Sequence, residues 1–202
     1  MRIGILGGTF NPVHIGHLII AEEVYHRHGL DRVQFIPSGQ PPHKNADDIV
    51  DARHRYEMVA LAIKDTDHFD VSDVEISREG KSYTIDTVEA HPELYGRDSD
   101  PHLIIGTDTV NELPTWKEIK RLAELCRIVV VNRPGNTLDN LNQLVPILGR
   151  EKVEEIRRIQ VEIPPVDISS TEIRRRLRSG LPISHMVPQN VELYIKKHGL
   201  YR

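Results

Sequence analysis

The stretch Gly7-Gly-Thr-Phe-Asn-Pro-Val-His-Ile-Gly-His-Leu18 follows a short apolar run at Arg2–Leu6 and leads into a longer run at Ile15–His28. The first run predicts a β-strand and the second an α-helix. The quoted residues therefore form a strand-to-helix turn that begins with two glycines. In an open α/β sheet, such turns lie at the carboxyl ends of the strands, where ligands bind. The stretch predicts both a parallel sheet and a ligand site at its first turn.

Short β-rich runs alternate with helical patterns along most of the chain. Strands are predicted at Arg2–Leu6, Arg32–Ile36, Phe69–Val74, His102–Ile105 and Arg127–Val131, with a weaker sixth at Ile159–Ile163. Helices are predicted at Ile15–His28, Asp51–Lys64, Thr84–Tyr95 and Trp116–Leu125. This alternation predicts an α/β fold with a doubly wound parallel sheet.

The C-terminal part changes character. Ser169–Ser179 and Pro188–His198 predict two helices with no strand between them. Ser169 with Glu172 suggests a capping box, and Gly180 and Gly199 suit the residue after each helix. We expect one domain over residues 1–202, with residues 165–202 as its short helical C-terminal extension. Residues 37–51 and 132–142 are expected to be loops.

Composition and charge limit the classes of partner. The formal net charge of −4 argues against a dedicated nucleic-acid binder, which usually carries a basic excess. It does not argue against a nucleotide site, because a few local donors meet the phosphates. A lone Cys126 excludes a disulfide framework and a cysteine-based zinc site, and no apolar run is long enough to span a bilayer. We expect a cytoplasmic protein without nucleic-acid or membrane partners, and the sequence leaves room for a homo-oligomer.

The first turn carries groups suited to phosphate. Gly7 and Gly8 permit unusual φ and close approach, so that main-chain N–H groups face phosphate oxygens. His14 and His17 are three residues apart, on one face of the helix start, and Gly16 between them leaves room for a bulky ligand. Two imidazoles there would donate hydrogen bonds to phosphate oxygens and stabilise charge that develops in a transition state.

Other interpretations of this turn stay open from the residues alone. A Gly-Gly pair after a strand often marks only a tight turn, and the spacing matches neither the Walker loop nor the Gly-x-Gly-x-x-Gly fingerprint. The two histidines could instead bind a metal, although no third ligand lies nearby in the sequence. They could also be a structural pair.

A second motif lies near the C-terminus, at Ile168-Ser-Ser-Thr-Glu-Ile-Arg174. Ser169 or Ser170 suits the cap of a helix whose free N–H groups point at an anion. Arg174 lies one turn inside on the same face as Ser170, where its guanidinium would grip phosphate oxygens. Without other evidence, such an arginine-rich helix is more often a solvated face.

Together the two motifs resemble the nucleotidyltransferase superfamily marked by a His-x-Gly-His motif, which also carries a Ser-x-Thr-x-x-Arg-like element. The resemblance implies a Rossmann-like sheet and transfer of a nucleotidyl group to a phosphate-bearing acceptor. It implies His14, His17 and Arg174 as catalytic residues, with Mg²⁺ carried by ATP and no protein metal site. The implied ATP-binding residues are Gly7, Gly8, Thr9, Phe10, His14, His17, Ile168, Ser169, Ser170, Thr171 and Arg174.

Three middle segments resemble the bacterial nicotinate-nucleotide adenylyltransferase family. They are Ser82-Tyr-Thr-Ile-Asp-Thr87, Ile104-Ile-Gly-Thr-Asp108 with Trp116, and Val130-Val-Asn-Arg-Pro134. The resemblance implies ATP and nicotinate mononucleotide as substrates and deamido-NAD and pyrophosphate as products. The implied acceptor-binding residues are Asn11, Lys44, Thr84, Gly106, Asp108, Trp116, Lys117 and Arg133.

Physical roles can be assigned to several of these residues. The backbone at Thr84, at a helix start, suits the pyridine carboxylate, and Trp116 suits stacking on the ring. Asp108 suits the ribose hydroxyls, and Lys44 and Arg133 suit phosphate. More ordinary roles compete: Thr84 as a helix cap, Trp116 as the cover of a core edge and Lys44 as a solvated loop residue.

One residue departs from the family pattern, and alternatives to the expected acceptor and function stay open. The family commonly has an aromatic residue after the tryptophan, where this chain has Lys117, so a side-chain contact there is in doubt while a backbone contact survives. Nicotinamide mononucleotide or phosphopantetheine are alternative acceptors, and a non-catalytic nucleotide sensor is an alternative function. Class I aminoacyl-tRNA synthetases share a similar histidine string, but they are much longer and have tRNA-binding regions.

Overall fold

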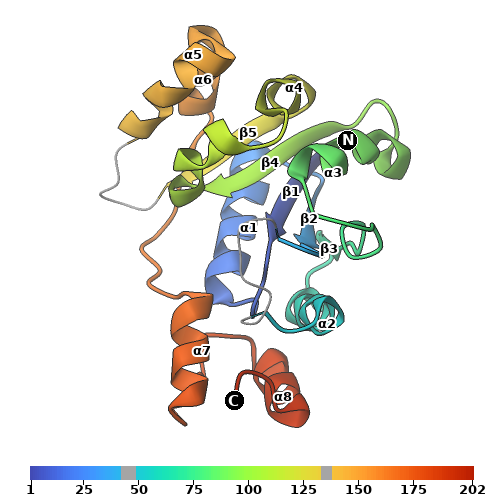
Figure 1. The fold of residues 1–202 in the computed structure, drawn as a ribbon, viewed down its shortest axis with the longest axis vertical. Coiled ribbons are helices and arrows are strands. Elements are labelled where there is room, and N and C mark those ends of the chain that lie inside the picture. The colour runs from blue at the N-terminus through green and yellow to red at the C-terminus, as the bar shows by residue number, and fades with distance from the viewer. Residues whose placement is uncertain (42–48, 133–137) are drawn as a thin grey trace. The chain divides into compact units, whose positions relative to one another are not determined.

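The computed structural model describes residues 1–41, 49–132 and 138–202 (Figure 1). The chain forms two compact units, each assembled from three segments. Unit 1 comprises Met1–Gly7, Ile20–Val33 and Tyr83–Pro165. Unit 2 comprises Gly8–Ile19, Gln34–Ser82 and Val166–Arg202. The expected C-terminal extension thus forms one segment of unit 2, while the expectation of a single domain stays a prediction.

The sheet has the strand order β3-β2-β1-β4-β5-β6. The order runs outward from β1 in one direction and then from β4 in the other, which is the doubly wound, Rossmann-like arrangement that the sequence predicts. Strands β1 and β4, β4 and β5, and β5 and β6 pair in parallel. The strands are β1 Arg2–Gly8, β2 Arg32–Pro37, β3 Phe69–Val71, β4 Asp100–Gly106, β5 Arg127–Asn132 and β6 Val161–Glu162.

Unit 1 is built around β4 and β5. Residues Ile128–Val131 of β5 are buried, as a strand covered on both faces should be. Helix α3 packs against α4, and α6 packs against β5. The helices are α3 Thr84–Tyr95, α4 Ile119–Leu125, α5 Val145–Leu148 and α6 Arg150–Arg158, and the 3-10 segments are η2 Thr107–Asn111, η3 Leu113–Thr115 and η4 Asp139–Leu144.

Among its described residues, unit 2 contains three complete α-helices, α2 Ala52–Ile63, α7 Ser170–Arg178 and α8 Gln189–His198. Helix α2 packs against α8. The side-chain amide of Asn190 donates to the carbonyl of Leu61, and a His54 ring nitrogen lies 2.9 Å from the Tyr194 hydroxyl. Helices α7 and α8 follow one another without a strand, in orange and red in Figure 1. The helical character predicted for the C-terminal part is confirmed.

Element boundaries differ from the predictions at a few places. Helix α1, Ile15–His28, and helix α3 have the predicted bounds. Helix α4 begins at Ile119 rather than Trp116, because Trp116 ends the preceding 3-10 segment and Glu118 has a left-handed φ of 51°. Strand β3 ends at Val71, three residues earlier than predicted.

The helix ends follow the predicted signals in part. The Ser169 hydroxyl accepts from the Glu172 N–H at 3.1 Å, which caps α7. The reciprocal half of the capping box is absent among the described contacts, because the Glu172 carboxylate binds the Arg175 guanidinium at 2.7 Å instead. Gly180 and Gly199 have φ values of 66° and 62°, the left-handed geometry for which glycine is suited.

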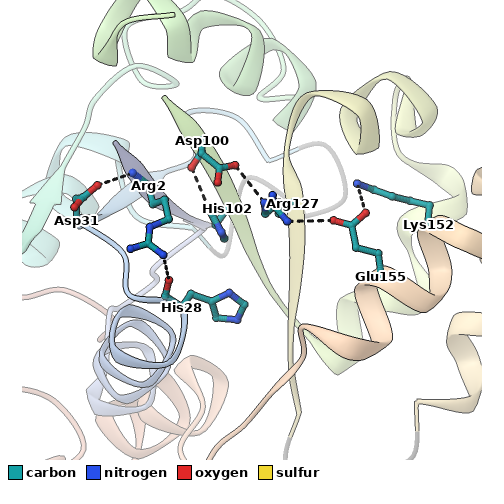
Figure 2. Close-up of polar contacts among 8 residues, drawn as sticks. All are labelled: Arg2, His28, Asp31, Asp100, His102, Arg127, Lys152 and Glu155. Carbon is teal, nitrogen blue, oxygen red and sulfur yellow. Dashed lines mark hydrogen bonds and ion pairs between the residues drawn. The ribbon is translucent and has the colours of Figure 1, made fainter. Parts of the chain in front are cut away.

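A polar network, which we call the amino-end network, lies where β1, β4 and β5 begin in unit 1 (Figure 2). Its centre is Asp100. The Asp100 carbonyl lies 3.0 Å from Nδ1 of His102, and its carboxylate lies 3.4 Å from Nε of Arg127. The members are Arg2, His28, Asp31, Asp100, His102, Arg127, Lys152 and Glu155.

No described helix is long and apolar enough to cross a membrane.

Candidate active site

The loop after β1 has its unusual backbone at Phe10 rather than at the glycines. Strand β1 continues through Gly8, and neither Gly7 nor Gly8 has a positive φ. Phe10 has a φ of 48°, and its ring is buried. A Cβ on Gly8 would lie 3.1 Å from that ring. The glycine pair permits an unusual φ but does not adopt a positive one here: Gly8 provides space for Phe10, and Phe10 makes the turn.

His14 and His17 lie against each other, as their spacing predicts. Their ring centroids are 3.7 Å apart at 30°. The His14 N–H donates to Nδ1 of His17 at 3.1 Å, so a neutral His17 carries its proton on Nε2. The Phe10 ring packs edge-on against the His17 ring, with centroids 5.0 Å apart. A Cβ on Gly16 would lie 3.0 Å from Nδ1 of His14, so the space beside Gly16 accommodates that imidazole.

The C-terminal motif binds this same loop within unit 2. The Ser170 hydroxyl donates to the Pro12 carbonyl at 2.8 Å. Nη1 of Arg174 donates to the Asn11 carbonyl at 2.9 Å. Two motifs separated by more than 150 residues are thereby joined by hydrogen bonds. The backbone of Asn11, which was expected near the acceptor, thus lies against Arg174.

Arg174 retains a donor. Its Nε is buried and has no hydrogen-bond partner within the described part of the chain. An arginine presents its donors in a fixed planar fork, which suits phosphate oxygens. Nearby, burial raises the pKa of the Tyr201 phenol, although Arg174 and Arg55 act in the opposite direction. The phenol is therefore neutral and carries no charge that would offset either guanidinium group. We call Phe10, His14, His17, Ser170 and Arg174 the phosphate cluster.

Arg55 was missed by sequence reasoning. It lies in the first turn of α2 and is only 1% exposed. Its guanidinium donates to three main-chain carbonyls, including that of Thr9 in the loop after β1. Its position in the sequence was the signal that could have indicated a buried arginine. Arg55 precedes Met58 and Val59 by three and four residues, and these two apolar residues on the same helical face are fully buried. A charged residue on such a face needs polar partners inside the protein.

Thr84 lies at the first position of α3 in unit 1, and Tyr83 is the N-cap. No side chain caps this helix end, so the interpretation of Thr84 as a hydroxyl cap is wrong. The N–H groups of the first helical turn have no partner within their own helix. They give the start of α3 a partial positive charge that suits a carboxylate.

Asp108 lies directly beyond β4, in the 3-10 segment η2, and is exposed. A Cβ on Gly106 would meet the Asp108 carboxylate, so the glycine leaves room for that side chain in its present position. The Thr107 hydroxyl lies 2.9 Å from the Val131 carbonyl, so the carboxyl ends of β4 and β5 are tied together. This edge therefore presents a carboxylate on a fixed backbone.

Trp116 and Lys117 follow segment η3 in the same unit. Trp116 is half-buried, so part of its indole is accessible. Nζ of Lys117 lies 2.9 Å from the Asp86 carboxylate and 5.0 Å from the centre of the Tyr83 ring. The hydrogen bond to Asp86 raises the pKa of Lys117. The side chain of Lys117 is therefore attached to the first turn of α3.

Two of the predicted site residues lie outside the described residues, and the described residues form no evident metal site. Lys44 and Arg133 fall within 42–48 and 133–137, which are outside the described part. Among described residues, no group of three or more histidines, cysteines and carboxylates could hold a metal ion. Cys126 is buried, which raises the pKa of its thiol to about 12 and leaves it protonated.

Sequence comparison places the chain among known proteins. The model of the family described as cytidylyltransferase-like matches residues 5–176. A Moorella thermoacetica protein named as a probable nicotinate-nucleotide adenylyltransferase is 42% identical, covering 100% of this chain and 92% of the relative. A Syntrophotalea carbinolica protein of the same name is 43% identical, covering 100% of this chain and 98% of the relative.

Solved structures share the fold. The nicotinic acid mononucleotide adenylyltransferase of Plasmodium falciparum, complexed with NaAD, is similar with a TM-score of 0.77 at 18% identity. The similarity covers 99% of this chain and 97% of that one. A putative nicotinate-nucleotide adenylyltransferase from Vibrio parahaemolyticus gives a TM-score of 0.70 at 23% identity, covering 100% of this chain and 95% of the other.

Proposed function

The chain belongs to the nicotinate-nucleotide adenylyltransferases, within the cytidylyltransferase-like family, and from that premise we propose how its residues join ATP to nicotinate mononucleotide. The reaction transfers the adenylyl group of ATP to the acceptor phosphate and gives nicotinate adenine dinucleotide, NaAD, and pyrophosphate. The observation that carries the assignment of residues is the hydrogen bonding of Ser170 and Arg174 to the loop that precedes the stacked histidines.

The phosphate cluster binds the triphosphate of ATP. The Nε2–H of His17 and the unpartnered Nε–H of Arg174 supply donors from two elements that the loop carbonyls hold in place. Main-chain groups of Gly7–Phe10, the histidine His14 and the start of α7 at Ile168–Thr171 complete the ATP site. Donors held in advance in a partly buried site stabilise developing charge without reorganisation.

Most of the residues that we assign to the acceptor belong to unit 1. The N–H groups at the start of α3, at Thr84, receive the pyridine carboxylate. The accessible part of the Trp116 indole stacks on the pyridine ring. Asp108, with Gly106 behind it, accepts hydrogen bonds from the ribose hydroxyls. Lys117 contributes its backbone N–H, because its ammonium is bound to Asp86. We propose that Lys44 and Arg133 bind the phosphate of the acceptor or the leaving pyrophosphate. Asn11 is proposed to contact the acceptor as well.

The chemistry requires positioning and charge stabilisation. A phosphate oxygen of nicotinate mononucleotide attacks the α-phosphorus in line, the bond to the β-phosphate oxygen breaks, and pyrophosphate leaves. The attacking oxygen is ionised at neutral pH, so neither a general base nor a protein nucleophile is needed. Holding both reactants in line can supply up to about 7–11 kcal/mol of the barrier, and His17 and Arg174 stabilise the charge on the phosphates.

Mg²⁺ enters as part of the substrate MgATP. The triphosphate supplies most of the oxygen ligands that Mg²⁺ requires, and water supplies others. The metal reduces the repulsion between two anionic reactants. A cytoplasmic location belongs to the same proposal, because a free buried thiol at Cys126 suits a reducing compartment.

An acceptor comparison tests the proposed function. Pyrophosphate release is measured with MgATP and, in parallel, nicotinate mononucleotide, nicotinamide mononucleotide or phosphopantetheine, and NaAD is identified by chromatography. We expect release to be fastest with nicotinate mononucleotide, and EDTA to abolish it. Faster release with another acceptor would retain the adenylyl transfer and remove the acceptor assignments. ATP binding without release for any acceptor would favour a nucleotide sensor.

A further inference from the structure

Arg55 is the largest fully buried side chain in the described part of the chain, and the proposed reaction does not use it. Its guanidinium donates to three carbonyls at separate places in unit 2. Nη1 bonds Thr9 at 2.8 Å, Nη2 bonds Gly39 at 3.2 Å, and Nε bonds Val50 at 3.0 Å. One side chain thus joins the loop after β1, the loop after β2 and the residue that precedes the N-cap of α2.

The charge of Arg55 has no counter-ion in its described surroundings. No described carboxylate lies within ion-pair distance of the guanidinium, and its polar contacts are main-chain carbonyls. Burial lowers the pKa of Arg55, while Tyr201 and Asp51 act to raise it. An arginine nevertheless stays protonated in proteins. A neutral side chain could pack a core at lower cost, so the retained cation indicates a requirement at the three carbonyls.

The Thr9 carbonyl is the contact that reaches the phosphate cluster. It shares a peptide group with the N–H of Phe10, and cis geometry in the described chain occurs only at Asn11–Pro12. In a trans peptide the C=O and the N–H point in opposite directions. A guanidinium that holds the Thr9 oxygen therefore directs the Phe10 N–H away from Arg55. The neighbouring Phe10 ring packs against His17.

The remaining two contacts are themselves fixed. The Gly39 N–H donates to the Ser82 hydroxyl at 2.9 Å, and a Cβ on Gly39 would clash with the Glu75 carbonyl. Val50 precedes Asp51, whose side chain caps α2 by accepting from the Arg53 N–H at 2.8 Å. Arg55 therefore links the Thr9–Phe10 peptide to two fixed parts of unit 2, which are the start of α2 and the loop at Gly39.

We propose that Arg55 is a positioning residue of the adenylyl-transfer site, which holds the Thr9 carbonyl so that the Phe10 N–H faces an ATP phosphate and the Phe10 ring supports His17. The proposal rests on the proposed function. Arg55 does not touch the nucleotide. It acts through the peptide that does, and the phosphate cluster has its geometry only while the Thr9 carbonyl is held.

The test compares Arg55→Lys and Arg55→Ala with wild type and with Arg53→Ala. Arg53 is an exposed arginine two residues away on the same helix, and its cation lies 6.0 Å from the Tyr56 ring. MgATP affinity is measured by calorimetry without acceptor, and kcat and both KM values are measured with acceptor. The Arg55→Ala assays are repeated with guanidinium at a concentration that does not denature the wild type. Melting temperatures are recorded for every variant.

We expect folded Arg55→Lys and Arg55→Ala proteins to bind MgATP about tenfold or more weakly, as loss of charge-assisted hydrogen bonds predicts. Their kcat should fall, and their acceptor KM should change little. Added guanidinium should restore ATP affinity to Arg55→Ala, and Arg53→Ala should match wild type. A purely structural role predicts a lower melting temperature with unchanged affinity and kinetics.

Folded variants with wild-type ATP affinity and kcat would overturn the proposal. Failure of both variants to fold would also reject it, in favour of a role in folding alone. Loss of ATP affinity that guanidinium does not restore would count against it. If the wild type binds MgATP but transfers to no acceptor, the proposed function fails, and the calorimetric comparison still decides the role of Arg55.

Discussion

At the scale of single residues, the direction of one hydrogen bond determines what His17 can do. The His14 N–H occupies Nδ1 of His17, so the neutral imidazole offers Nε2–H as a donor. A donor of this kind stabilises phosphate charge without changing its protonation state. The Phe10 ring and the His14 ring limit the positions that the imidazole can adopt. In the proposed mechanism the histidine pair therefore acts as a fixed donor rather than as an acid or a base.

Substitution His17→Ala tests this role. We expect kcat to fall about 10²–10³-fold, which is typical for loss of one donor to a developing oxyanion. The melting temperature should change little, because the side chain is only half-buried. His26→Ala is the matched control, since His26 is exposed on the same helix and bonded to Glu22. Wild-type turnover in His17→Ala would remove His17 from the mechanism.

Trp116 is the only tryptophan of the chain, so its fluorescence would report on the acceptor site that we propose. We expect nicotinate mononucleotide to quench this fluorescence if the pyridine ring stacks on the indole. Trp116→Ala should raise the acceptor KM about tenfold, within the range of about 1–3 kcal/mol for stacking on an aromatic side chain. Trp116→Phe should restore most of the affinity, and the KM for ATP should stay unchanged in both. Unquenched fluorescence at saturating acceptor would contradict the stacking.

At the scale of secondary-structure elements, the hydrophobic periodicity of the sequence was sufficient to predict a helix where many residues on one face are apolar. It was insufficient elsewhere. Helices α1 and α3 have the predicted bounds. Helix α6, Arg150–Arg158, was not predicted, because Val153 and Ile156 are its only buried residues and the others are charged. The start of α4 was wrong because the left-handed Glu118 depends on local geometry that no hydrophobic pattern encodes.

The two histidines of the amino-end network, His28 and His102, predict that the stability of the folded protein depends on pH (Figure 2). His102 is buried, and burial chiefly lowers its pKa, with Arg127 and Arg2 acting in the same direction and Asp100 opposing. The neighbouring His28, whose ring centroid is 5.6 Å away, also has a lowered pKa because of burial and of His102. The unfolded chain therefore binds protons first as the pH falls.

We expect the free energy of unfolding to decrease below about pH 6.5, the pKa of an unperturbed histidine, and the decrease to end once the folded state is also protonated. In His102→Gln the decrease should be shallower, by at most about 1.4 kcal/mol per pH unit for one proton. Urea unfolding between pH 7.5 and 5.5 measures both slopes. His26→Gln, at an exposed position, is the control. Equal slopes for wild type and His102→Gln would show that His102 does not titrate as proposed.

At the scale of the whole molecule, the sequence predicted the order of the strands, most of the helices between them and both motifs, but not the contacts that join the motifs. The Ser170–Pro12 and Arg174–Asn11 bonds connect opposite ends of the chain, and no local pattern specifies such pairs. Arg55 was missed for the same reason, since its three carbonyl partners, at Thr9, Gly39 and Val50, are not adjacent in the sequence. The roles of the acceptor residues stay predictions, including those of Lys44 and Arg133.

The central claim is that the adenylyl group passes directly from ATP to nicotinate mononucleotide between residues that hold both reactants. The most direct test is the stereochemical course with ATP made chiral at the α-phosphorus. A single in-line displacement predicts NaAD with inverted configuration at that phosphorus. Retention would contradict the account, because it requires two displacements and therefore a covalent adenylyl intermediate on a protein nucleophile.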